Sequence, residues 1–136
     1  MSHPQITFRQ SHFTSSTSLL SRRRNTTREI TLHAQLKQLK TTGRYDCFKL
    51  QWQSIYEDKS MWPVPFHLFW DSDVAKWIEG ACYFLEEAYN KDVDAAVQDL
   101  VGMIRGAQQE DGYLNVHYTV VEPTKRWSNL RDMHEL

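Results

Sequence analysis

The sequence predicts an all-α domain, because its apolar residues recur mainly at the spacing of a helix. Two such patterns, over residues 71–89 and 93–107, are separated only by the short turn at 90–92, and a third covers residues 26–40. Helices joined by so short a turn pack as an antiparallel hairpin. The 136 residues, 40 % of them hydrophobic, suffice for one globular domain. No apolar run approaches the ~18 residues that a membrane-spanning helix requires.

The first predicted helix begins near Thr26 and ends before Gly43. Thr26 and Glu29 have the spacing of a capping box, in which the hydroxyl accepts a backbone N–H and the carboxylate reaches back. Its apolar face is formed by Leu32, Leu36 and Leu39. Gly43 provides a left-handed stop. Residues 1–25 are expected to be an irregular, basic segment that precedes a domain over residues 26–136.

Charge is distributed unevenly along the chain. Residues 1–40 carry seven Lys or Arg and one Glu, including Arg22-Arg23-Arg24, whereas residues 41–136 carry nine Lys or Arg and 16 Asp or Glu. The basic end fits a nucleic-acid arm, a transit peptide or a solvated connection. A nucleic-acid function is the weakest of our hypotheses, because the acidic remainder would repel phosphate. The first 20 residues lack the apolar core of a secretory signal, so we expect a reducing, cytoplasmic location.

Residues 51–70 are rich in aromatic side chains and contain Pro63 and Pro65, which disfavour a regular helix. We expect a long aromatic loop there, and such loops often line a site. Tryptophan and tyrosine faces can stack on sugar rings, although core packing is their commoner role.

The strongest predicted helix covers residues 71–89, and the second covers residues 93–107. Asp71, Ser72 and Asp73 offer an N-cap and favourable negative charge for the first of them. Its apolar face is formed by Val74, Trp77, Ile78, Ala81, Cys82, Leu85 and Ala88. The face of the second is formed by Val93, Ala96, Val97, Leu100, Val101, Ile104 and Ala107.

The last quarter of the chain is predicted to turn at Asp111-Gly112 and then to be extended over residues 113–121, which are β-branched and aromatic. A further helix start follows at Ser128 or Asn129, and the sequence stops at Leu136. A helix of about eight residues gains little alone, because nucleation is costly. The pattern therefore predicts that the sequence stops inside a larger domain.

Individual polar residues leave alternatives open. Asp71 and Asp73 either cap a helix or form a pair of site carboxylates. His134, flanked by acidic residues, is either a surface residue or points into a pocket at a helix end. Cys47 and Cys82 lack the spacing of zinc ligands, which favours small buried apolar residues.

Several segments of the sequence match the motifs of a known family, in the same order and with approximately the same spacing. They are Thr42-Gly43-Arg44, residues 69–79 (FWDSDVAKWIE), residues 111–115 (DGYLN), and residues 118–123, 125–127 and 129–136 (YTVVEP, KRW and NLRDMHEL). Together they closely resemble the N-terminal part of glycoside hydrolase family 127, the β-L-arabinofuranosidase family, over about residues 20–136.

The resemblance implies a fold and an activity. Family members have an (α/α)6 barrel followed by β-sandwich domains, so residues 26–136 would be the first few helices of that barrel. They remove non-reducing-end β-L-arabinofuranosyl units with retention, using a cysteine nucleophile, a zinc ion and a glutamate acid/base. Neither Cys47 nor Cys82 matches these motifs. We therefore expect no catalytic residue and no metal or other cofactor here, and an inactive fragment. The alternative is a non-catalytic carbohydrate-binding or scaffold remnant.

The resemblance also implies substrate-binding residues. His134 takes the place of the family histidine that faces the sugar in the terminal subsite. Asp71, Asp73 and Trp127 would lie near the mouth of the barrel, and the aromatic loop at 61–70, with Trp62 and Trp70, would form its rim. The expected partner is an L-arabinofuranoside, with no nucleic acid and no membrane. Apolar helix faces left uncovered would favour self-association.

Overall fold

The computed structural model describes residues 18–52, 66–128 and 130, which contain helices and no β-strand. The prediction of an all-α fold is therefore confirmed for these residues. The helical elements are α1 (Leu19–Thr26), η1 (Thr27–Thr31), α2 (Leu32–Thr41), η2 (Arg44–Lys49), η4 (Phe66–Phe69), α3 (Trp70–Glu87), α4 (Lys91–Ala107), α5 (His117–Val120) and η5 (Pro123–Lys125).

The N-terminal helices α1 and α2 are joined without a break by η1, a short π-helix. Ser18 caps the start, because its hydroxyl accepts a hydrogen bond from the Ser21 N–H at 3.0 Å. The predicted start near Thr26 is therefore wrong, since Thr26 already has helical backbone angles and its hydroxyl donates to the Arg22 carbonyl. The helix begins inside the segment that was expected to be irregular. At the other end the prediction holds, because Gly43 has a φ of +82°.

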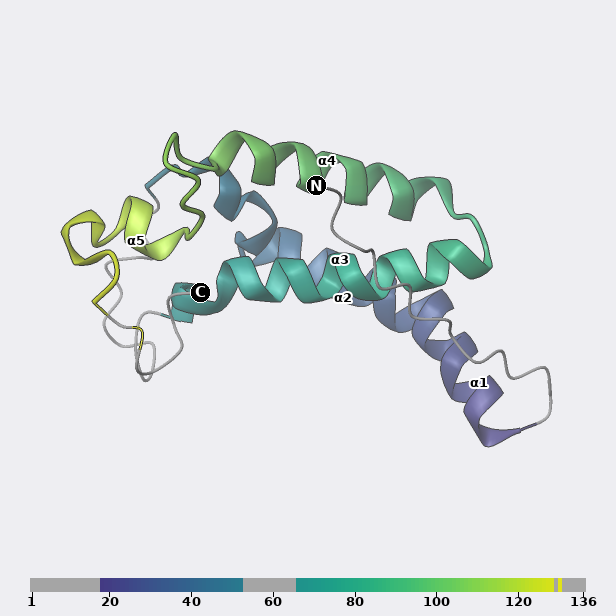
Figure 1. Cartoon of the computed structure of the whole chain (residues 1–136). Coiled ribbons are helices and arrows are strands. Elements are labelled where there is room, and N and C mark those ends of the chain that lie inside the picture. The colour runs from purple at the N-terminus through teal and green to yellow at the C-terminus, as the bar shows by residue number, and fades with distance from the viewer. Residues whose placement is uncertain (1–17, 53–65, 129, 131–136) are drawn as a thin grey trace.

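The predicted hairpin is formed by α3 and α4, which run antiparallel beside each other (Figure 1). Its turn is fixed by Asn90, whose side-chain oxygen accepts from the backbone N–H groups of Asp92 and Val93, both at 3.1 Å. The α2 helix packs against α3, and the Trp77 indole N–H donates to the Leu32 carbonyl at 3.1 Å. The α1 helix extends away from this body (Figure 1).

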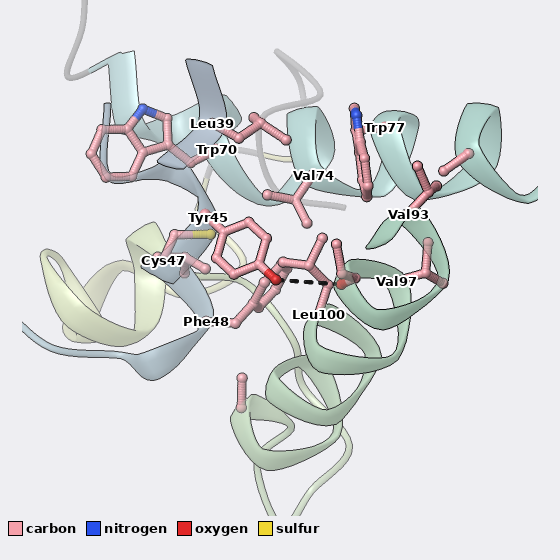
Figure 2. Close-up of a cluster of buried hydrophobic side chains, with 14 of the residues drawn as sticks. Leu39, Tyr45, Cys47, Phe48, Trp70, Val74, Trp77, Val93, Val97 and Leu100 are labelled. Atoms are coloured by element: carbon pink, nitrogen blue, oxygen red, sulfur yellow. Dashed lines mark hydrogen bonds between the residues drawn. The ribbon is translucent and has the colours of Figure 1, made fainter. Parts of the chain in front are cut away.

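The main core lies between η2, α3 and α4 (Figure 2). Trp70, Val74 and Leu100 are fully buried there. Tyr45 reaches across from η2, and its hydroxyl donates to the Asp99 carboxylate at 2.8 Å. The rim role expected for Trp70 is not what the structure shows, because the indole is packed inside this core. Trp62 lies outside the described residues.

Two cysteines have different environments. Cys47 is buried in the core, as expected, but Cys82 is exposed, so its assignment to the apolar face of α3 is wrong. Ala88, the last residue predicted on that face, is also exposed, because α3 ends at Glu87.

The segment that was predicted to be extended forms the short helix α5 instead. Asn115 caps it, since its side-chain oxygen accepts from the Tyr118 N–H at 3.0 Å. Four consecutive residues, 115–118, are buried. Burial of adjacent residues excludes the alternating pattern of a half-buried strand, so tertiary packing overrides the β-propensity of this segment. The helix start predicted at Ser128 or Asn129 falls mostly outside the described residues, and Ser128 itself lies in a bend.

Candidate functional site

The structure separates Asp71 and Asp73, for which the sequence left open a capping role or a shared site. Asp71 faces the segment around Val116, whereas Asp73 faces Arg44 and α2. Trp127 lies beyond η5, in a third position. His134 lies outside the described residues, so its expected place in a terminal subsite stays a prediction.

Asp71 connects the start of α3 to a segment 45 residues further along the chain. One carboxylate oxygen accepts from the Ser72 N–H at 2.8 Å, and the other accepts from the Val116 N–H at 3.2 Å. Burial raises the pKa of the Asp71 carboxyl, and these backbone donors offset only part of that effect. Asp71 therefore holds the segment that leads into α5 against the N-terminal end of α3.

His117 is the buried titratable residue of the α5 segment, with an exposed fraction of 2 %. Its Nε2 lies 3.1 Å from a carboxylate oxygen of Glu122. Burial lowers the pKa of His117, although the hydrogen bond to Glu122 acts in the opposite direction. The ring is therefore neutral at pH 7, and its Nε2–H donates to Glu122. Lys125 contacts the same carboxylate at 2.6 Å and is the largest cause of the lowered pKa of Glu122.

Trp127 belongs to a surface group of four residues, which we call the Trp127 cluster: Asp111, Tyr113, Arg126 and Trp127. The Trp127 ring meets Tyr113 edge-on, with centroids 4.9 Å apart. The Arg126 guanidinium carbon lies 3.6 Å from the centroid of the Tyr113 ring, and one of its nitrogens donates to Asp111 at 2.9 Å. The cluster thus places the exposed Trp127 indole, a cation and a carboxylate around the buried ring of Tyr113.

Two features of Trp127 favour a binding role. The residue is 61 % exposed, which is unusual for so large an apolar side chain. Its φ is +65°, a left-handed backbone conformation that bulky residues rarely adopt and that is often found at functional sites. An exposed indole can stack on the apolar face of a sugar, while the neighbouring Arg126 and Asp111 can bond hydroxyl groups.

Asp73 lines a hollow of about 440 Å³ between α2 and α3. Its carboxylate accepts from Arg44 Nε at 3.2 Å, and Lys76 Nζ lies 3.9 Å from the other oxygen. We call this the α2–α3 hollow, and it is lined by Gln35, Gln38, Leu39, Arg44, Asp73, Lys76 and Trp77. Neither member of the expected pair, Asp71 or Asp73, serves as the N-cap of α3, which is Phe69.

The environment of Cys47 does not favour a reactive thiolate. Burial raises the pKa of the Cys47 thiol, and the Asp71 carboxylate adds to that effect, so the thiol stays protonated. Within residues 18–52, 66–128 and 130, no three His, Cys, Asp or Glu side chains gather as metal ligands. The zinc site that the family resemblance implies does not fit these residues, and we derive no step through it.

Sequence reasoning did not single out His117, Glu122, Arg126, Tyr113 or Asp111 as individual residues. All five lie in or beside the segments that carry the family resemblance. The contact between Arg126 and Asp111, which are 15 positions apart, becomes visible only in the folded structure. Among the described residues, none of the helices has both the length and the apolar character needed to cross a membrane.

Comparison with known proteins gives a consistent result. Residues 14–136 match the family model described as β-L-arabinofuranosidase, GH127 catalytic domain. The non-reducing end β-L-arabinofuranosidase of Bifidobacterium longum subsp. longum is 36 % identical over 77 residues, which cover 52 % of this chain and 12 % of that protein. The chain therefore aligns with only a small part of that relative. No solved structure matches.

Proposed function

We propose a function from one premise: this chain belongs to glycoside hydrolase family 127, the β-L-arabinofuranosidase family. The protein that contains it removes terminal β-L-arabinofuranosyl units from the non-reducing end of a carbohydrate. The named relative supports this choice of substrate, and the extent of the family match supports the reaction class. In this proposal the described residues bind and position the substrate, and the reacting groups come from elsewhere in the protein.

The helices form the first part of an (α/α)6 barrel in this proposal. The antiparallel packing of α3 and α4, with α2 against α3, is the arrangement that supports it (Figure 1). Such a barrel places its loops around a common opening. The loop that follows α5 then carries the Trp127 cluster to that opening.

The observation that carries the proposed site is the exposed, ordered indole of Trp127. Tyr113 and Arg126 fix the position of the loop around it, and Asp111 fixes Arg126. We assign Trp127 and His134 to the terminal subsite, where Trp127 stacks on the sugar ring and His134 takes the place that the family resemblance implies. Asp71 and His117 are positioning residues, because they hold the segment that leads to both.

The experiment is hydrolysis of p-nitrophenyl β-L-arabinofuranoside by the intact protein, with and without zinc and reductant. Trp127→Ala should raise KM about fivefold, because one aromatic contact with a ligand contributes about 1 kcal/mol. Trp52→Ala is the matched control, since Trp52 is 52 % exposed and lies outside the cluster. This control should keep the unsubstituted KM.

Three results would count against the proposal. Equal KM values for the two tryptophan variants would remove Trp127 from the site. Turnover by the 136-residue chain alone would place the reacting groups inside it. Binding of the sugar by an intact protein that never hydrolyses it would favour a non-catalytic carbohydrate-binding module.

A further inference from the structure

We propose that the α2–α3 hollow binds a neutral saccharide, at a position separate from the Trp127 cluster. Its volume of about 440 Å³ lies within the ~300–1,000 Å³ range that is typical of small-molecule sites. It is built from α2, η2 and α3, whereas the Trp127 cluster lies on the segments around α5 and η5.

Two aligned amides form one wall of the hollow. Gln35 and Gln38 are three positions apart on α2, so their side chains project from the same face of that helix. Each amide carries both a donor and an acceptor. A pair of amides in this arrangement can bond neighbouring hydroxyl groups of one sugar ring.

The charged residues of the opposite wall are paired with one another. Arg44 and Lys76 both approach Asp73, and the first of them donates to it directly. Because these charges partly compensate one another, the wall offers hydrogen-bond donors and acceptors beside an ion pair that is already formed. A neutral ligand whose hydroxyl groups both donate and accept can satisfy all of these side chains together.

The floor of the hollow is rigid. Trp77 has its indole N–H bound to the Leu32 carbonyl at 3.1 Å, which fixes the orientation of the ring, and Leu39 is buried beside α3. Arg44 is also restrained, because its guanidinium lies 5.6 Å from the centroid of the Trp70 ring. An apolar floor with polar walls matches a sugar, which has an apolar face and a polar edge. The choice of an arabinoside as the saccharide rests on the proposed function.

The test is hydrogen exchange of the intact protein, followed by mass spectrometry, with methyl β-L-arabinofuranoside or inorganic phosphate added. The sugar should protect peptides that cover residues 32–44 and 70–77, and phosphate should not. The Gln35→Ala, Gln38→Ala double variant should lose that protection. Gln98→Ala, which alters an exposed glutamine of α4, should keep it. Both variants should hydrolyse p-nitrophenyl β-L-arabinofuranoside at the unsubstituted rate.

The outcomes separate this inference from the proposed function. Hydrolysis without protection of the α2 and α3 peptides would overturn the saccharide site and leave the proposed function standing. Protection without hydrolysis would support the site and count against the proposed function. Protection by phosphate alone, or equal protection in the double variant, would overturn the site.

Discussion

Asp71 and Asp73 are separated by one residue, and their carboxylates have different partners. Residues two apart on a helix point about 200° apart, so a shared role at one site was geometrically unfavourable from the start. Asp71 bonds backbone N–H groups inside the molecule, and Asp73 pairs with cations at its surface. One motif therefore carries a carboxylate that bonds the backbone and a carboxylate that lines the α2–α3 hollow.

Removal of the Asp71 carboxylate tests its structural role. Asp71→Ala leaves the Val116 N–H without its acceptor and should lower the free energy of unfolding by about 1–3 kcal/mol. Asp71→Asn keeps one acceptor oxygen, so its cost should be smaller. Urea denaturation of each variant measures the change. Asp92→Ala is the control, because Asp92 is exposed in the first turn of α4 and should cost at most about 1 kcal/mol. If Asp71→Ala lowers the free energy of unfolding no more than Asp92→Ala does, the bond from the Val116 N–H to Asp71 does not have the structural role described here.

His117 should make stability depend on pH. Burial holds the pKa of the folded histidine below the ordinary value of 6.5, so the unfolded state binds more protons between those two values. The contribution is fully present above about pH 6.5 and is lost as pH falls through the unfolded pKa toward the folded one. Melting temperatures measured from pH 8 to pH 5 should therefore decline, and His117→Gln should flatten that decline.

A packing variant separates titration from a general loss of stability. Val116→Ala removes a buried apolar side chain beside His117 and should lower the melting temperature about equally at each pH. A pH profile for His117→Gln that keeps the unsubstituted slope would assign the dependence to other groups.

At the scale of elements, two glycines should respond differently to substitution by alanine, because only one of them has a positive φ. Gly43 ends α2 with a φ of +82°, so Gly43→Ala should cost about 1–2 kcal/mol of unfolding free energy. Gly80 lies within α3, and an added Cβ would meet nothing within 4 Å. Gly80→Ala should therefore stabilise the protein by about 0.5–1 kcal/mol. Thermal unfolding of both variants measures the two changes in stability. If both changes have the same sign, the argument from φ is wrong.

The helical hairpin could be predicted from the sequence because its signals are local. Asn90 caps α4, and the apolar spacing of both helices follows from their own residues. The α5 segment could not be predicted, because Val116 and His117 are both buried by partners distant in sequence. The start of the first helix was missed because Ser18 provides a cap that looks like any other serine of a Ser/Thr-rich stretch.

The candidate site was predictable only in part, for the same reason. Trp127 was predicted as a site residue from its motif, and its exposure and positive φ are the structural features that favour a binding role. The pairing of Arg126 with Asp111 and the hollow beside Asp73 depend on the packing of separate elements. Such contacts cannot be predicted from the spacing of residues along the sequence.

At the scale of the whole molecule, the core is continuous from η2 through α3 and α4 (Figure 2), and no residue of α1 belongs to it. None of the residues of α1 is buried. Its connection to the body includes the ion pair between Arg24 and Glu87, which joins it to the end of α3. Both side chains of this ion pair are partly buried.

This arrangement predicts self-association of the 136-residue chain when it is produced alone. Leu19 and Leu20 in α1 and Ile30 in η1 are each 63 % exposed, and neighbouring molecules can bury them together. The sedimentation coefficient should therefore rise with protein concentration. The Leu19→Glu, Leu20→Glu double variant should move that rise to protein concentrations at least about a hundredfold higher, because each leucine contributes about 1.5–3 kcal/mol when it is buried.

The control must add the same charge without changing an apolar surface. Gln98→Glu with Gln108→Glu does so on exposed polar positions, and it should associate like the unsubstituted chain. If both double variants dissociate equally, net charge and not α1 governs association. If neither changes, the contact surface lies elsewhere. If sedimentation is independent of concentration, α1 needs no covering partner, and Leu19 and Leu20 are solvated residues at a helix end.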